Sequence, residues 1–281
     1  MGIVIPLKCL ICLTHQVMEK MLKPIPLNID SVFLKRTVRA DLYINSLHDP
    51  KNAELLLIND GQDLATMNFE DIHQKVMYPG KSLICVGIHA GEDRKLEYGV
   101  IGQPDYMGRG SRAGDYARFI LEELMPVVHQ RSGIDQFQRK ACCGFSLGGL
   151  MAFDMVMEYP ELFHSCGVFS GSFWWRSKSL EEGYVEERDR IMHAKLRTKK
   201  LTAGQRFFLQ TGQLDEKADR NKNGIIDSID DTLGIIIELK KLGFEDGKQI
   251  RYEELPDGSH DIKTWSRVMP VFLDWLLTSS K

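Results

Sequence analysis

The feature that most constrains this fold is a serine flanked by glycines, at Gly144, Ser146 and Gly148. A short apolar run precedes it, and residues 147–157 read as a helix. A strand that turns this tightly into a helix leaves no room for a Cβ at either glycine. The pattern therefore predicts a nucleophile elbow, with Ser146 at the helix N-terminus. The alternative is a glycine-rich turn with an idle serine.

A nucleophilic serine also needs donors for the oxyanion that forms during acyl transfer. The N-terminus of a helix offers free amides and the positive end of its dipole. We expect one donor to be the backbone N–H of Leu147. The turn that follows an apolar run at 54–59 is expected to supply the second, at Gln62.

The rest of the chain alternates strand-like and helix-like segments. Continuous apolar runs at 54–59 and 82–88 are typical of parallel strands buried on both faces, whereas the alternating stretch 38–45 suits an antiparallel edge. This order predicts an α/β-hydrolase fold in a single domain, with a mostly parallel central sheet flanked by helices. Further strands are expected at 166–170, 206–211 and 249–255, and helices at 113–130 (kinked at Pro126), 232–242 and 261–277.

Three expected strand ends supply a serine, an acid and a histidine, in the chain order of α/β-hydrolases. A serine hydroxyl becomes a strong nucleophile when a neutral imidazole takes its proton and a carboxylate orients that imidazole. His260 follows the last strand in a short turn and is the expected base. Asp215 is the expected acid, and Asp219 is the second candidate.

Other side chains near the strand ends are candidates for the substrate pocket. Ligands of open α/β sheets bind at the C-terminal ends of the strands. His89 and Arg94 lie in the loop after the expected strand 82–88. Trp174 and Trp175 follow another strand, and such aromatics either pack under a loop or line a pocket. We predict all four as substrate-pocket residues.

The loop after Asp215 has oxygen-bearing side chains at the spacing of an EF-hand calcium loop, with Gly224 at position six. Position twelve is Asp230 instead of the usual glutamate, so its reach to an ion is shorter. The alternative is a polar loop that binds no ion. A structural Ca²⁺ here would stiffen the loop that presents Asp215, and no cofactor is otherwise required. The expected ligands are Asp219, Asn221, Asn223, Ile225, Asp227 and Asp230.

The composition narrows the class of partner. A formal net charge of -3 over 281 residues gives no sign of the excess positive charge that binds nucleic acid or an anionic membrane. The apolar run 3–13 is broken by Lys8 and is too short to span a bilayer. We expect an N-terminal extension at 1–30 and a catalytic domain at 31–281. Six cysteines, mostly in apolar runs, suit a reducing compartment. We therefore expect a cytoplasmic protein, with a periplasmic or secreted one as the alternative, and leave a homodimer open.

Taken together, these motifs resemble the putative esterase family of α/β-hydrolases, from about Leu42 to the C-terminus. The family includes enterochelin esterases, esterase D, feruloyl and acetyl xylan esterases and the antigen 85 mycolyltransferases. The segment before Leu42 is too short for the N-terminal domain of some enterochelin esterases, and the EF-hand-like loop is not a general family feature. The resemblance rests on 59–62, Arg94 with 97–98, 144–149, 170–175 and 258–260.

The resemblance implies the same roles for Ser146, His260 and the amides near Gln62 and Leu147. We expect a serine carboxylic-ester hydrolase that forms an acyl-enzyme with a small-molecule or carbohydrate-linked ester. Two alternatives stay open. One is acyl transfer to an alcohol or sugar by the same triad, and the other is a non-catalytic binding protein on a hydrolase fold.

Overall fold

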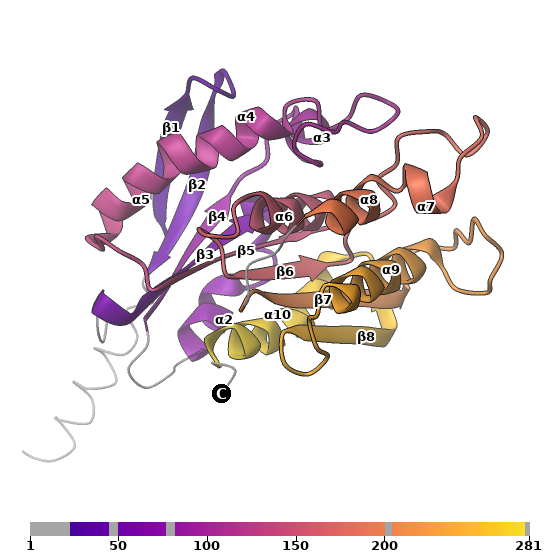
Figure 1. Ribbon diagram of the computed structural model, residues 1–281. Coiled ribbons are helices and arrows are strands. Elements are labelled where there is room, and N and C mark those ends of the chain that lie inside the picture. Colours follow the sequence, from indigo (N-terminus) through magenta and orange to yellow (C-terminus); the bar gives the residue numbers. More distant parts are fainter. Residues whose placement is uncertain (1–22, 45–49, 77–81, 200–203, 279–281) are drawn as a thin grey trace, which may run out of the picture.

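The computed structural model describes residues 23–44, 50–76, 82–199 and 204–278. Its described residues form an eight-stranded sheet with helices on both faces (Figure 1). The strands are β1 (Ile25–Ser31), β2 (Arg36–Ile44), β3 (Ala53–Asn59), β4 (Ser82–Ile88), β5 (Arg139–Phe145), β6 (Ser165–Phe169), β7 (Arg206–Leu214) and β8 (Ile250–Ser259).

The strand order across the sheet is β1-β2-β4-β3-β5-β6-β7-β8. β2 pairs antiparallel with β1 and with β4, and every other pair is parallel. The prediction of an α/β-hydrolase fold with a mostly parallel sheet is therefore confirmed. β5 lies between β3 and β6, so the turn that carries Ser146 leaves the middle of the sheet.

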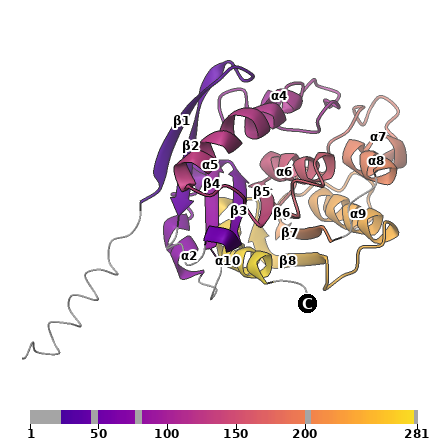
Figure 2. The ribbon, with the colours of Figure 1, turned by 60° about the vertical axis from the view of Figure 1, so that its left-hand side comes forward.

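The helices divide between the two faces of the sheet (Figure 2). One core cluster joins α4, α5, α6, α8 and α9 to the sheet, and a second joins α2 and α10 to the opposite face. The helical segments are η1 (Pro50–Asn52), η2 (Gly61–Asp63), α2 (Phe69–Lys75), α3 (Arg94–Glu97), α4 (Ala113–Arg118), η3 (Phe119–Leu124), α5 (Met125–Ser132), α6 (Leu147–Glu158), α7 (Glu186–Asp189), α8 (Ile191–Thr198), α9 (Asp227–Lys241) and α10 (Ile262–Leu277).

The burial of each strand explains its sequence pattern. Every residue of β3 and β4 is buried, because both faces are covered by helices. β2 begins with exposed residues on one face and therefore alternates. It is not an edge strand as predicted, because β1 pairs with its outer side. β1 begins within the range 1–30 that was predicted as an extension, so the sheet starts at Ile25.

The segment predicted as one helix over 113–130 contains a break before Pro126. The π-helical turn η3 separates α4 from α5, and Pro126 lies in the first turn of α5. Proline has no N–H to donate and its ring clashes with the carbonyl four residues earlier. A wider π turn accommodates that clash, so the irregularity precedes the proline.

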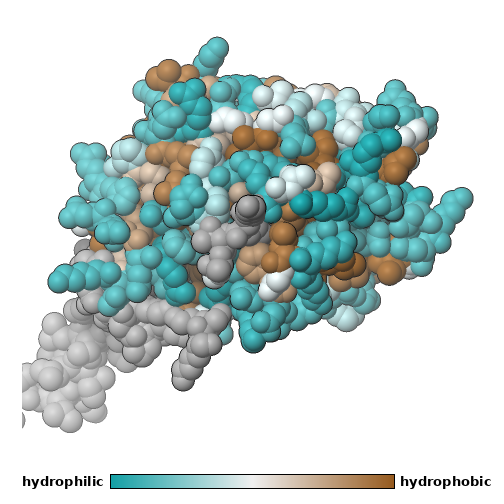
Figure 3. Space-filling model, viewed as in Figure 1, coloured by the Kyte–Doolittle hydropathy of each residue, from teal (hydrophilic) through white to brown (hydrophobic). Residues whose placement is uncertain are grey.

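The face of the molecule seen in Figure 3 is mostly polar. Figure 3 shows hydrophilic residues over most of one face, with hydrophobic residues in small separate groups. No helix among the described residues is both long and apolar enough to span a bilayer. The apolar run 3–13 lies outside them. Four cysteines are buried with free thiols: Cys85, Cys142, Cys143 and Cys166.

Candidate active site

Ser146 stands in a strained turn between β5 and α6. Its backbone has φ 53 and ψ -118, a region that non-glycine residues avoid. The Ser146 N–H donates to the Phe169 carbonyl of β6 at 2.8 Å, which fixes the turn against the neighbouring strand. A Cβ at Gly144 would collide with the Gly148 carbonyl. The turn therefore requires glycine because of a close backbone approach.

Buried polar side chains hold the start of α6. The Asn59 amide donates from Nδ2 to the Gly148 carbonyl at 2.8 Å. The Tyr116 hydroxyl in turn donates to Asn59 Oδ1 at 2.6 Å. Both side chains are buried, so these bonds are shielded from water. The first turn of α6 is thus anchored to β3 and α4.

The amide of Leu147, predicted as an oxyanion donor, lies at the free end of this helix. The first bonds to the Ser146 carbonyl come from the N–H groups of Gly149 and Leu150. The amides of Leu147 and Gly148 precede them and have no acceptor within the helix. They are therefore available to an anion beside Ser146.

The turn predicted to supply the second donor is η2. Its first internal hydrogen bond runs from the Asp63 N–H to the Asp60 carbonyl, so the amide of Gln62 has no acceptor within the turn. Gln62 is exposed, and its side-chain Oε1 accepts from the Ala90 N–H at 3.0 Å. Asp60 has φ 64 and is buried. Its conformation bends the chain sharply at the end of β3.

A pocket of about 320 Å³ brings the three predicted catalytic residues together. Other pockets are larger, at about 510, 610, 370 and 340 Å³, but none of these is lined by a predicted catalytic residue. The chemistry of the lining and not the volume therefore identifies the site. The lining residues are Ser146, Ser170, Gly171, Trp174, Asp215, Glu216, Ser228 and His260.

His260 follows β8 directly and is held by packing. Its imidazole stands edge-on to the Trp265 indole, with ring centroids 5.3 Å apart. Within the described residues neither ring nitrogen has a hydrogen-bond partner. Burial lowers the pKa of His260, the Asp215 carboxylate raises it and the Arg94 charge lowers it, and the net direction is down. The imidazole is therefore neutral near pH 7, the form that accepts a proton.

Asp215, on the loop after β7, has one carboxylate oxygen that accepts a hydrogen bond and one that does not. Oδ2 accepts from the Gly212 N–H at 3.1 Å. Oδ1 is buried without a hydrogen-bond partner among the described residues. Burial raises the pKa of Asp215 above its usual value, although the Gly212 amide and the His260 charge lower it. An unpartnered carboxylate oxygen beside an imidazole is the arrangement that a triad acid requires.

Several residues that support this site were not predicted. The Trp265 Nε1–H donates to the Ser170 Oγ at 3.0 Å, and the hydroxyls of Ser146 and Ser172 are 3.3 Å apart. Ser170 also has a strained backbone, with φ 47. Trp265 lies on the buried face of α10, but no sequence pattern indicates which hydroxyl its N–H contacts.

Arg94 and His89, predicted in the substrate pocket, do not line it. Both are bound to aspartates: Arg94 binds Asp60 through Nε at 2.6 Å and Nη2 at 2.7 Å, and His89 Nε2 lies 2.6 Å from Asp41 Oδ2. The Asp60 carboxylate lies so close to Gly148 that a Cβ there would be 2.5 Å from Oδ2. Arg94 therefore braces η2 against the elbow and acts on the site through its charge.

The two predicted pocket tryptophans have different environments. Trp174 lines the pocket and is half-buried. Trp175 does not line it: the side chain is fully buried and its Nε1–H donates to the Gln103 carbonyl at 3.1 Å. Glycines at 99 and 110 leave room for this ring, since a Cβ at either would be 2.8 Å from it. Trp175 thus packs under the loop, and only Trp174 faces the pocket.

The predicted calcium loop folds around its first carboxylate. Asp219 accepts the N–H groups of Asn223 at 3.1 Å and Gly224 at 2.9 Å, and Gly224 has φ +86. The side-chain amides of Asn221 and Asn223 both donate to the Asp230 carboxylate, at 3.2 and 3.1 Å. Four of the predicted ligand side chains therefore meet in one loop.

Two other predicted ligands lie at the edge of this loop. Asp227 Oδ1 accepts from the Arg220 N–H at 2.9 Å, so this oxygen is already engaged. Ile225 donates its N–H to Asn223 Oδ1 at 2.8 Å. α9 begins at Asp227, five residues before the predicted helix start, so Asp227 and Asp230 belong to its first turn. An anionic first turn suits the helix dipole.

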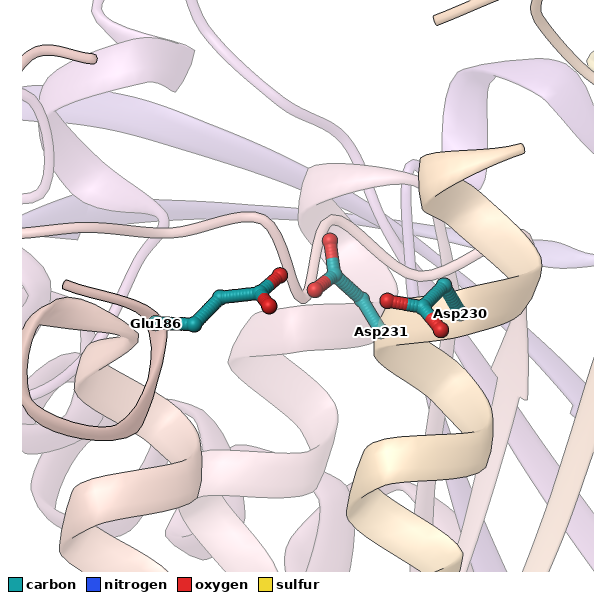
Figure 4. Close-up of side chains that lie close together, drawn as sticks. All are labelled: Glu186, Asp230 and Asp231. Carbon is teal, nitrogen blue, oxygen red and sulfur yellow. The ribbon is translucent and has the colours of Figure 1, made fainter. Parts of the chain in front are cut away.

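A neighbouring acidic cluster is neutralised by arginine. Figure 4 shows Glu186 of α7 and Asp231 of α9 with their carboxylates facing one another, beside Asp230. The Arg220 guanidinium contacts Glu186 Oε1 at 2.7 Å and also binds Asp231, and Arg190 lies 3.1 Å from Asp231. The cluster is thus filled by cationic side chains, which distinguishes it from the Asp219 loop.

Comparison with a protein family supports the sequence resemblance. A model of the family described as putative esterase matches residues 35–276. A curated relative, the uncharacterized protein YbbA of Bacillus subtilis, is 28% identical over 74 residues. That match covers 26% of this chain and 28% of YbbA, so the chain spans about a quarter of this relative.

Solved structures with the same fold include several esterases. The enterobactin esterase of Shigella flexneri has a TM-score of 0.67 at 19% identity, over 91% of this chain but only 59% of that one. An IroE-like serine hydrolase of Shewanella oneidensis has a TM-score of 0.65 at 18% identity, over 90% of this chain and 80% of that one. The siderophore hydrolase EstB of Aspergillus nidulans has a TM-score of 0.65 at 15% identity, over 100% of this chain and 99% of that one.

Proposed function

The chain belongs to the putative esterase family, as its motifs predict, and from that premise we propose that it is a serine carboxylic-ester hydrolase. The observation that carries the proposal is the shared pocket of Ser146, Asp215 and His260, at the end of a strained strand-to-helix turn. A strained turn costs stability and persists where the surrounding structure fixes it, which is common at functional sites.

In the proposed mechanism, His260 takes the proton of the Ser146 hydroxyl as Oγ attacks the ester carbonyl. The free amides of Leu147 and Gln62 stabilise the tetrahedral oxyanion. His260 then protonates the departing alcohol, which leaves an acyl-enzyme on Ser146. Water attacks the acyl-enzyme, with His260 as the base, and releases the acid and the free serine. Asp215 orients the imidazole throughout through its unpaired oxygen.

The structural neighbours suggest where to look for substrates. Their names describe an enterobactin esterase, a ferulic acid esterase and a siderophore hydrolase. We propose a small-molecule or carbohydrate-linked ester for this chain. Nitrophenyl acetate tests the mechanism without a known substrate: rapid release of one equivalent of nitrophenol, followed by a slower steady state, identifies an acyl-enzyme. Release of nitrophenol and acetate no faster than in buffer alone would contradict hydrolysis.

We also propose that the Asp219 loop binds a structural Ca²⁺. The side chains of Asp219, Asn221, Asn223 and Asp230 fit this role, because all carry oxygen and converge in one loop. Calorimetric titration of the metal-free protein with CaCl₂ tests the proposal. One site is expected in the wild type and a much weaker one in Asp219→Asn. Equal heats for the two proteins would contradict it.

A further inference from the structure

One wall of the Ser146 pocket is acidic. Glu216 lines it, next to Asp215, and is half-buried. Burial raises the pKa of Glu216, and nearby carboxylates, first that of Asp227, raise it further, whereas a hydrogen bond from the Ser228 backbone lowers it. The carboxylate is thus held at the first turn of α9, within a negative local field.

Two arginines near this wall are already paired with aspartates. The pocket lining contains no lysine or arginine, and Glu216 forms no ion pair with a described residue. Arg94, whose charge acts on His260, is bound to the buried Asp60. Arg109 stacks on Trp174 at 4.8 Å but binds Asp105 through Nε at 2.6 Å. Glu216 therefore lines the pocket without a cationic partner among the described residues.

A second group on the same wall is unpaired. Ser228 is 6% exposed and lines the pocket, and its Oγ has no hydrogen-bond partner among the described residues. A buried hydroxyl without a partner costs free energy unless a ligand or water bonds to it. The Oγ itself is buried, so this hydroxyl adds a polar group behind the wall, and the Glu216 carboxylate supplies the charge of the wall.

We propose that Glu216 is a charge-selectivity residue of this site. Together with Ser228 it favours esters that are cationic or uncharged and hydrogen-bonding near the carbonyl, and it disfavours esters with an anionic group there. The physical reason is that a carboxylate in a narrow, partly desolvated pocket repels a second anion more strongly than it would in water. The inference rests on the proposed ester hydrolysis and names the class of ester.

Matched esters that differ only in charge test the inference on both sides of the carbonyl. On the alcohol side, acetylcholine is compared with its neutral isostere 3,3-dimethylbutyl acetate. On the acyl side, nitrophenyl hemisuccinate is compared with nitrophenyl butyrate. At pH 8, Glu216→Gln keeps the size and acceptor oxygen of the side chain but removes its charge. In this variant we expect one of two changes in kcat/KM. Either the alcohol-side ratio moves about tenfold toward the neutral ester, or the acyl-side ratio moves about tenfold toward the anionic ester. The change should be smaller at high salt.

Two controls separate charge from structure. Glu216→Asp keeps the charge and should keep the selectivity. Glu253→Gln removes a carboxylate of β8 that pairs with Arg251 at 2.6 Å, away from the pocket, and should leave both ratios unchanged. Unchanged ratios in Glu216→Gln, with Ser146 still labelled by a fluorophosphonate, would overturn the inference alone. Absence of labelling in the wild type would overturn the hydrolase proposal and this inference with it.

Discussion

The elbow around Ser146 and the loop 215–226 present two members of the proposed triad, yet they are built in different ways. The elbow is made of backbone: its glycines are required by close contacts, and its neighbours are buried. The loop is made of polar side chains: most of its residues are exposed or half-buried, and its hydrogen bonds run from backbone amides to Asp and Asn side chains.

This difference indicates where each part draws its rigidity. Packing and steric contacts hold the nucleophile in place, and these contacts do not depend on salt, pH or chelators. The acid is held by charge, hydrogen bonds and, in our proposal, an ion, all of which respond to salt, pH and chelators. Changes at the elbow should therefore be severe under all conditions, whereas changes in the loop should depend on conditions.

The largest effect is expected for the nucleophile. Ser146→Ala should reduce kcat/KM for nitrophenyl acetate at least about a thousandfold, because the covalent route is lost. Ser172→Ala, which removes only the hydroxyl 3.3 Å from Ser146, is the matched control and should lose less than about tenfold. Steady-state kinetics of both variants provide the comparison. Substantial activity in Ser146→Ala would show that another residue attacks the ester.

The acid should matter less than the nucleophile. Asp215→Asn preserves the shape of the side chain but removes the charge that orients and stabilises the imidazolium, so we expect a loss of about a hundredfold to a thousandfold in kcat. Asp219→Asn, in the same loop, tests the second candidate for the acid. It should leave kcat nearly unchanged when Ca²⁺ is in excess. A larger loss in Asp219→Asn than in Asp215→Asn would show that Asp219, and not Asp215, is the triad acid.

The steric account of the elbow predicts a stability cost. Gly144→Ala should lower the free energy of unfolding by about 2–3 kcal/mol, because the new methyl group meets the Gly148 backbone. Gly114→Ala in α4 is the control, since nothing lies within 4 Å of its added Cβ. It should be neutral or stabilising by about 0.5–1 kcal/mol. Denaturant unfolding measures both, and equal midpoints would refute the account.

A smaller, conditional effect is expected in the loop. At a calcium concentration ten times its Kd, binding adds about 1.4 kcal/mol of stability, or about 2–3 °C in Tm for a chain of this size. EDTA should remove this gain and also reduce activity, because the loop presents Asp215. In Asp230→Asn, neither Tm nor activity should respond to Ca²⁺ or to EDTA. If Tm and activity are the same with and without EDTA, the loop needs no ion either for stability or for activity.

The sequence predicted the elbow well because its requirements are local. Gly144 is required by the approach of Gly148, four residues further on, and the apolar runs of β3 and β4 follow from burial on both faces. The requirement at Gly148 itself comes from the distant Asp60 side chain. The same reasoning failed for β1. Its alternation is short, and its place at the edge depends on pairing with β2.

The pocket residues were harder to predict because their partners are distant in sequence. Nothing local indicates that Arg94 binds Asp60 or that His89 binds Asp41, and these pairs remove both from the lining. Glu216 was missed because a glutamate in a polar loop has no distinctive pattern. Its significance comes from facing the same pocket as Ser146, which only the fold determines.

The central claim is that Ser146 reacts because a neutral His260 accepts its proton. The most direct measurement is the rate at which a fluorophosphonate labels Ser146, followed by mass spectrometry across pH. Burial holds the pKa of His260 below about 6.5, so the rate should rise with pH through a midpoint below that value and then level off. The rate should collapse in His260→Gln. An unlabelled Ser146, or labelling that is indifferent to His260 and to pH, would contradict the account.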